Sequence, residues 1–200
     1  MKYEWKKEEK ELYLPKEEPT LVTIPRMKYF TITGKGNPNN KDFQDKIGVL
    51  YSLAYAVRMM PKNGYTPNGY FEYTVYPLEG IWSGNVEDKN SFVYKIMIRQ
   101  PDFVCNDVVE KAFEIARRKK PNILLDEVKF EEFTDGLCVQ MLHIGSYDDE
   151  PKSFEKMQKF IANNNYERTT DTHREIYLSD STKVEKDKLK TILRYFIKKN

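Results

Sequence analysis

The sequence lacks an excess of charge of either sign. Its 33 Lys and Arg residues nearly balance its 31 Asp and Glu residues, so the formal net charge is only +2. Proteins that grip nucleic acid through its phosphates usually carry a basic surface. The one basic run, residues 117–120, ends a predicted helix, where positive charge suits the negative end of the helix dipole. We therefore expect no direct contact with nucleic acid.

Cysteine and long apolar runs are also scarce. The two cysteines, Cys105 and Cys138, have no Cys or His neighbours at the spacing of a zinc site. The N-terminal residues MKYEWKKEEKELY contain no apolar core of a signal peptide, and no run approaches the length of a membrane span. The sequence thus predicts reduced thiols, no metal, no cofactor, no membrane contact and a cytoplasmic location.

Aromatic residues are abundant, at 14% of the chain, with 14 Tyr and 11 Phe. Many lie in predicted strands, where amphipathic rings can line a wet cleft, and this favours a ligand pocket. A length of 200 residues allows one domain, or two small halves that share a core. Residues 1–19 alternate Lys and Glu around a few aromatics, and we interpret them as a charged arm that is either solvated or docked.

The rest of the chain shows the same order of elements twice. Residues 20–100 contain a strand at 27–33, an amphipathic helix at 41–60, and strands at about 70–76 and 91–100. A connecting helix is expected within residues 105–120. Residues 121–200 then contain a lead-in strand, a turn at Asp135 and Gly136, a strand at 137–144, a helix at 150–163 and a strand at 173–180. Periodicity leaves the closing segment at 188–199 as a strand or a short helix.

This order predicts an α+β fold of two pseudosymmetric β-α-β-β repeats. The repeats form a curved antiparallel sheet, with helices on one face and a ligand cleft on the other.

The strand HREIYLSD carries the strongest candidate for chemistry. Alternation places Ile176 and Leu178 on one face, and His173, Glu175 and Tyr177 on the other. A carboxylate on a sheet face costs free energy unless it is solvated, paired or used. Glu175 is therefore our candidate general base, and the alternative is a glutamate that merely points to water.

Other candidates are weaker on sequence grounds. Glu79 lies at a predicted turn, where a structural hydrogen bond is an equal alternative. His143 lies in an apolar strand, and a hydrogen-bonded core histidine is the simpler interpretation. No Ser/His/Asp or Cys/His set can be assembled from the sequence, and neither can a metal site.

Three motifs, HREIYLSD, HIGSYDDEP and PLEGIW, occur in an order that resembles the GyrI-like small-molecule-binding family. The resemblance covers residues 20–200, and this family also supplies effector domains of multidrug-sensing transcription regulators. It implies a ligand in the concavity of the sheet, Glu175 in that pocket, and Trp82 and Tyr147 at aromatic pocket positions. The 19 preceding residues cannot hold a helix-turn-helix segment, so a stand-alone member is expected.

Stand-alone members with these motifs resemble hydrolases that open the strained cyclopropane of DNA-alkylating natural products. The resemblance implies that Trp82 stacks on the flat substrate, that Glu175 activates water, and that Tyr147 or Tyr177 donates a hydrogen bond to the substrate oxygen. Two alternatives stay open: a non-catalytic binder of amphipathic, cationic aromatic compounds, and a module that binds a protein such as a topoisomerase.

Overall fold

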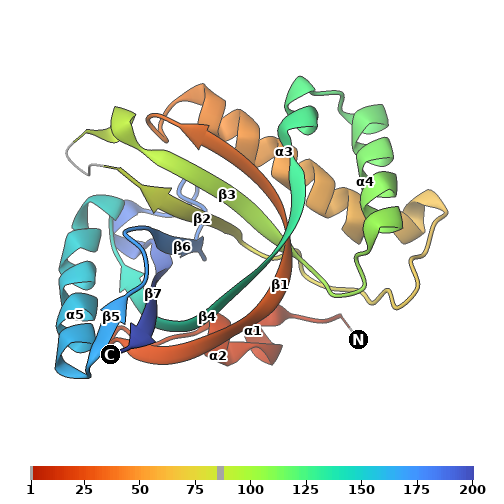
Figure 1. Cartoon of the computed structure of the whole chain (residues 1–200). Helices are drawn as coiled ribbons and strands as arrows, with labels where there is room; N and C mark the ends of the chain where they lie inside the picture. Colours follow the sequence, from red (N-terminus) through yellow and green to blue (C-terminus); the bar gives the residue numbers. More distant parts are fainter. Residues whose placement is uncertain (1, 85–87) are drawn as a thin grey trace. The chain divides into compact units, whose positions relative to one another are not determined.

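The protein is described by a computed structural model that covers residues 2–84 and 88–200 (Figure 1). Two compact units make up the chain. Of the described residues, unit 1 contains 2–5, 27–78, 84 and 88–133, and unit 2 contains 6–26, 79–83 and 134–200. Two long strands, β1 (Thr20–Lys35) and β4 (Lys129–Ile144), continue from one unit into the other.

Unit 1 is built on the antiparallel pairing of β1 with β3 (Val93–Gln100), in which Tyr29 faces Arg99 and Lys35 faces Val93. The helices of this unit are α3 (Lys41–Arg58) and α4 (Asn106–Lys119), and they lie side by side in Figure 1. Their apolar stripes supply buried residues to the core, so the helices predicted at 41–60 and 105–120 are confirmed. Short 3-10 helices occur at Met60–Asn63, Lys89–Ser91 and Ile123–Glu127.

The prediction of a strand at about residues 70–76 is wrong. Residues 74–77 are irregular, Tyr73 makes only an isolated parallel bridge with Tyr3, and the strand in this region is β2 (Leu78–Ser83). The alternating aromatic residues contribute to side-chain packing and not to a strand. Tyr73 is buried against neighbouring rings, and its carbonyl accepts a hydrogen bond from Arg58. The shift places Glu79 and Trp82 within a strand.

Unit 2 contains a set of antiparallel pairings in which β2 pairs with β6, β6 with β7, and β7 with β4. The short strand β5 pairs with the last residues of β7. The bounds of the new elements are β5 (Tyr166–Arg168), β6 (His173–Tyr177), β7 (Lys190–Lys199), α5 (Glu150–Asn163), and 3-10 helices at Tyr147–Asp149 and Lys186–Lys188. The closing segment is therefore a strand.

One face of this sheet packs against α5. Met157 and Ile161 of the helix are buried against Val139 and Met141 of β4 and Leu193 of β7. The helix predicted at 150–163 is confirmed. The turn predicted at residues 135 and 136 is wrong, because β4 runs through both residues.

The N-terminal arm begins with two single-turn helices, α1 (Trp5–Glu8) and α2 (Lys10–Tyr13). Within unit 2, Tyr13 is buried, and the carbonyl groups of Glu11 and Leu12 accept hydrogen bonds from Gln140 and Arg194. This segment thus satisfies buried polar side chains on the sheet.

The α+β class and the antiparallel strand pairing are as predicted. The order strand, helix, strand, strand occurs in both predicted repeats, with β5 added in the second.

Candidate functional site

Strand β6 is buried on both faces, and alternation distributes its side chains between them. Glu175 faces Leu193 of β7 in register, so it lies on the sheet face that packs against α5. Arg174 and Ile176 point to the other face. On the β2 side, Gly80 lies opposite Glu175, and Trp82 lies opposite His173. The expectation that Glu175 shares a face with His173 and Tyr177 is confirmed. The expectation that Glu175 lies on the sheet face opposite the helices is wrong, because its register with Leu193 places it on the face covered by α5.

The carboxylate of Glu175 accepts hydrogen bonds on both oxygens. His173 Nε2 lies 2.8 Å from Oε1, and the Tyr177 hydroxyl donates to Oε2 at 2.6 Å. Trp82 Nε1 donates in turn to the Tyr177 oxygen at 2.8 Å. These donors provide hydrogen bonds to a carboxyl group that is only 9% exposed, so its burial does not leave its oxygens without partners.

Gly80 makes room for this arrangement. A Cβ atom at residue 80 would lie 2.5 Å from Trp82 Nε1, closer than any side chain tolerates. The indole therefore lies over the glycine, and its N–H reaches the Tyr177 hydroxyl. Trp82 is 6% exposed, so little of the ring faces solvent.

Tyr147 lies at the exposed edge of the same cluster. Its ring meets that of Tyr177 edge-on, with centroids 6.0 Å apart, and 39% of the residue is accessible. Burial of the phenol raises the pKa of Tyr147. A hydrogen bond with Ser181 lowers this pKa, and the charge of Glu175 raises it further. Tyr147 therefore stays a hydrogen-bond donor at neutral pH.

Glu150 is a member of the cluster that the sequence did not reveal. It is the first residue of α5, is 6% exposed, and forms a hydrogen bond with Glu175. Burial raises its pKa well above the usual range, and the charge of Glu175 and their shared hydrogen bond raise it further. The available signal was its place in HIGSYDDEP, three residues after Tyr147.

Two carboxyl groups in contact cannot both ionise cheaply, so they share a proton. The raised pKa of Glu150 puts that proton on Glu150. Burial also raises the pKa of Tyr177 well above its usual range, with the charge of Glu175 as the next cause. The cluster thus combines one carboxylate base, one neutral carboxylic acid and two protonated phenols.

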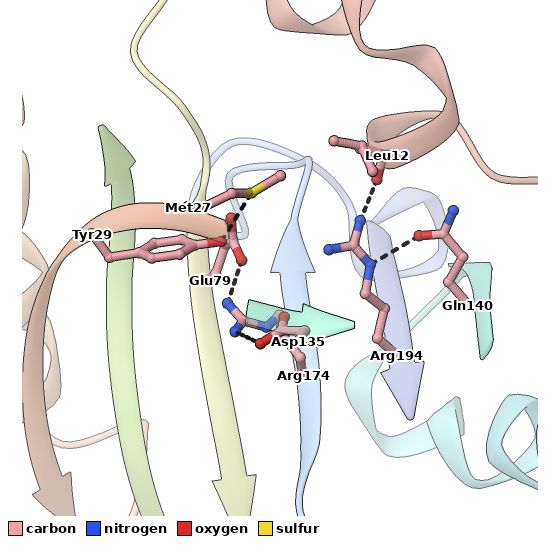
Figure 2. Close-up of polar contacts among 8 residues, drawn as sticks. All are labelled: Leu12, Met27, Tyr29, Glu79, Asp135, Gln140, Arg174 and Arg194. Atoms are coloured by element: carbon pink, nitrogen blue, oxygen red, sulfur yellow. Dashed lines mark hydrogen bonds and ion pairs between the residues drawn. The ribbon is translucent and has the colours of Figure 1, made fainter. Parts of the chain in front are cut away.

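The other two predicted residues lie elsewhere. Glu79 is on the opposite sheet face, where its Oε2 accepts from Arg174 Nη1 at 2.8 Å (Figure 2). Arg174 Nη2 also donates to Asp135 Oδ1 at 2.8 Å. His143 contacts Ser153 and the Ser146 carbonyl. The structure brings Glu175, Tyr147, Trp82 and Tyr177 together and leaves Glu79 and His143 outside.

Figure 2 also shows Arg194, which faces Arg174 in register and points toward Gln140 Oε1 and the Leu12 carbonyl. This face is a buried ionic layer.

Within residues 2–84 and 88–200, no group of three His, Cys, Asp or Glu residues could hold a metal ion. None of the helices in these ranges is long and apolar enough to cross a membrane.

Comparison with known proteins identifies one family. The model of the GyrI-like small molecule binding domain matches residues 17–197. A hydrolase from Listeria innocua is 35% identical, with a TM-score of 0.94, and the alignment covers 99% of this chain and 100% of that one. An uncharacterized conserved protein from Listeria innocua is 38% identical, with a TM-score of 0.92, and the alignment covers 98% of this chain and 100% of that one.

More distant similarity is limited to the fold. The C-terminal domain of EcmrR is 16% identical, with a TM-score of 0.55 over 92% of this chain and 98% of that one. No curated protein matches the chain. Because the family model spans most of the sequence, the chain belongs to the GyrI-like small molecule binding domain family.

Proposed function

We propose that the protein is a hydrolase that adds water to the strained cyclopropane of planar, electrophilic genotoxins and so detoxifies them. The observation that carries this proposal is the buried carboxyl pair, in which Glu150 contacts Glu175 and has a pKa raised well above its usual range by burial and by that contact. A similar protein, at 35% identity, is described as a hydrolase, which supports the reaction class. The ligand class and the reaction rest on the resemblance to stand-alone members of the family.

The proposed chemistry uses a cyclopropane conjugated to a dienone. Water loses a proton to Glu175 while its oxygen bonds to a ring carbon, and the strained C–C bond breaks. The electron pair moves through the dienone to its oxygen, which gains a proton and becomes a phenol. Tyr147 is the accessible donor for that oxygen. The proton that Glu175 took from water then replaces the one that Tyr147 donated, with Glu150 as the acid that shares it, so the cluster returns to its starting state.

His173, Tyr177 and Trp82 are positioning residues in this scheme. They fix both oxygens of Glu175, because each carboxylate oxygen has its own donor and the Tyr177 donor is itself held by Trp82. A fixed base raises the rate by reducing the motion needed to reach the attacking water.

The test is to mix purified protein with a cyclopropane-bearing DNA alkylator and to follow the products by mass. We expect catalytic gain of one water by the wild type, and a loss of about 100-fold or more in Glu175→Gln, which is the scale of general base catalysis. Binding of a neutral planar ligand should change by less than about tenfold. Glu167→Gln, an exposed change on β5, is the matched control and should retain turnover.

Unchanged turnover in Glu175→Gln would refute the base assignment. Recovery of unmodified compound from the wild type would favour the second candidate, a binder of cationic aromatic compounds. One observation supports that candidate: the carboxyl group of Glu175 lies in one cluster with the rings of Trp82, Tyr147 and Tyr177, a combination that suits a cationic aromatic compound.

Trp82 provides a separate test of ligand binding. We expect Trp82→Ala to weaken binding of a planar ligand by roughly 1 to 3 kcal/mol, through lost aromatic area and loss of the donor that holds Tyr177. Isothermal titration measures this change. An effect on turnover with no change in affinity would restrict Trp82 to positioning.

A further inference from the structure

A second pair of reactive side chains, His143 and Ser153, lies outside the Glu175 cluster. His143 is on β4, and Ser153 is in the first turn of α5. The Ser153 Oγ atom lies 2.9 Å from His143 Nδ1, and His143 Nε2 lies 3.0 Å from the Ser146 carbonyl oxygen. Both side chains are buried, and neither has a role in the chemistry proposed above.

The geometry fixes which ring nitrogen carries the proton. The Ser146 carbonyl can only accept, so Nε2 must be the protonated nitrogen. In the neutral imidazole Nδ1 is then an acceptor, and the Ser153 hydroxyl donates to it. This is the hydrogen-bond direction that general base activation of a serine requires.

The imidazole is held on its second side as well. The Ser146 carbonyl also accepts from the Asp149 backbone N–H at 2.9 Å, which fixes the direction of the oxygen. Gly145 has a backbone φ angle of 137°, a value that favours glycine. A Cβ atom at residue 145 would lie 3.5 Å from His143 Nε2. A base oriented by a third group completes the arrangement of a nucleophile site.

A surface cavity of about 610 Å³ is lined in part by both side chains. Its wall includes His143, Ser153 and the apolar residues Met141, Leu142 and Ile144. Three ammonium groups, of Lys152, Lys156 and Lys186, are matched by three carboxylates, of Glu17, Asp149 and Asp187. The matched charges select neither a cation nor an anion, so a neutral molecule with an apolar part fits best.

We propose that Ser153 and His143 form a catalytic dyad that hydrolyses neutral carboxylic esters in this cavity. Ser153 Oγ bonds to the ester carbonyl carbon as its proton passes to His143 Nδ1. The ester C–O bond then breaks, and the imidazolium gives that proton to the departing alkoxide. Water attacks the acyl-serine with His143 as base, which releases the carboxylic acid and restores the serine.

A fluorophosphonate probe tests the nucleophile directly. We expect one phosphonyl adduct on the wild type, mapped by peptide mass spectrometry to Ser153, and no adduct at any residue in Ser153→Ala. The matched control is Ser52→Ala, which changes a half-buried helical serine whose hydroxyl donates to the Val49 carbonyl of its own helix. That variant should label like the wild type.

Ester turnover tests the catalytic role of the pair. With p-nitrophenyl butyrate as substrate, Ser153→Ala and His143→Gln should each lose about 100-fold or more in rate. Ser153→Cys keeps a nucleophile at the same position, so it should react with iodoacetamide faster than Cys105 of the same protein does. Melting curves establish that each variant is folded.

Three results would overturn the proposal. They are an unlabelled Ser153 in folded wild type, ester turnover that survives Ser153→Ala, or an inert thiol in folded Ser153→Cys. Each would leave His143 as a core histidine that only satisfies hydrogen bonds.

Discussion

Two buried charged clusters lie on opposite faces of β6, one around Arg174 and one around Glu175. The guanidinium of Arg174 donates to two carboxylates, Glu79 and Asp135, at 2.8 Å each. Glu175 has no Lys or Arg partner among the ion pairs of the described residues, and its contacts are an imidazole, a phenol and a second carboxyl group. One cluster pairs opposite charges, and the other holds two acids together.

The difference separates structure from function. A buried cation with hydrogen-bonded carboxylates satisfies groups that the fold has buried. A pair of buried carboxyl groups instead costs stability, because one of them must stay protonated at pH values well above its normal pKa. Arrangements of this second kind are concentrated at sites of chemistry. The comparison supports a structural role for Glu79 and a functional role for Glu175.

The largest effect is expected from Arg174→Met. Removal of the guanidinium leaves Glu79 and Asp135 buried without their cation, which should lower the free energy of unfolding by about 3 to 5 kcal/mol. Urea denaturation followed by circular dichroism measures this change.

The control is Arg117→Met, which breaks an ion pair with Asp126 whose side chains are mostly exposed. It should change the free energy of unfolding by less than about 1 kcal/mol. Equal losses in the two variants would mean that burial does not distinguish the Arg174 cluster.

A pH-dependent effect is expected from Glu150→Gln. The raised pKa of Glu150 means that the folded protein holds a proton that the unfolded chain releases above pH about 4.3. Stability should therefore fall as the pH rises above that value, by up to about 1.4 kcal/mol per pH unit. Gln cannot titrate, so the fall should be shallower in Glu150→Gln.

Urea denaturation at a series of pH values measures both slopes. Glu155→Gln changes an exposed glutamate of the same helix and should keep the slope of the wild type. Identical slopes in the wild type and Glu150→Gln would show that the two carboxyl groups do not share a proton.

A smaller effect is expected from Tyr177→Phe. The change removes one donor to Glu175 and the acceptor of Trp82, so stability should fall by about 1 to 3 kcal/mol. If the proposed reaction holds, turnover of a cyclopropane-bearing alkylator should fall while the fold survives, because Glu175 keeps His173 but loses its second hydrogen-bond donor. Unchanged turnover would remove Tyr177 from the positioning set.

Periodicity predicted most of the elements because helices and strands repeat at different intervals. The helices at residues 41–58, 106–119 and 150–163 each carry an apolar stripe, and the alternation of β6 placed Glu175 with His173 and Tyr177. The failures involve long-range partners. Asp135 and Gly136 have the composition of a turn, but Asp135 pairs with Arg174 from a strand 39 residues later.

The sequence by itself determined the α+β class, the family and the strand that carries Glu175, because these depend on local periodicity and on short motifs. Only the tertiary structure showed that Glu150 joins Glu175, that Glu79 pairs with Arg174, and that Ser153 meets His143. These contacts depend on strand register and on the position of a helix end. Neither strand register nor the position of a helix end produces a periodic pattern in the sequence. Contacts between residues that are distant in sequence therefore become visible only in the folded structure.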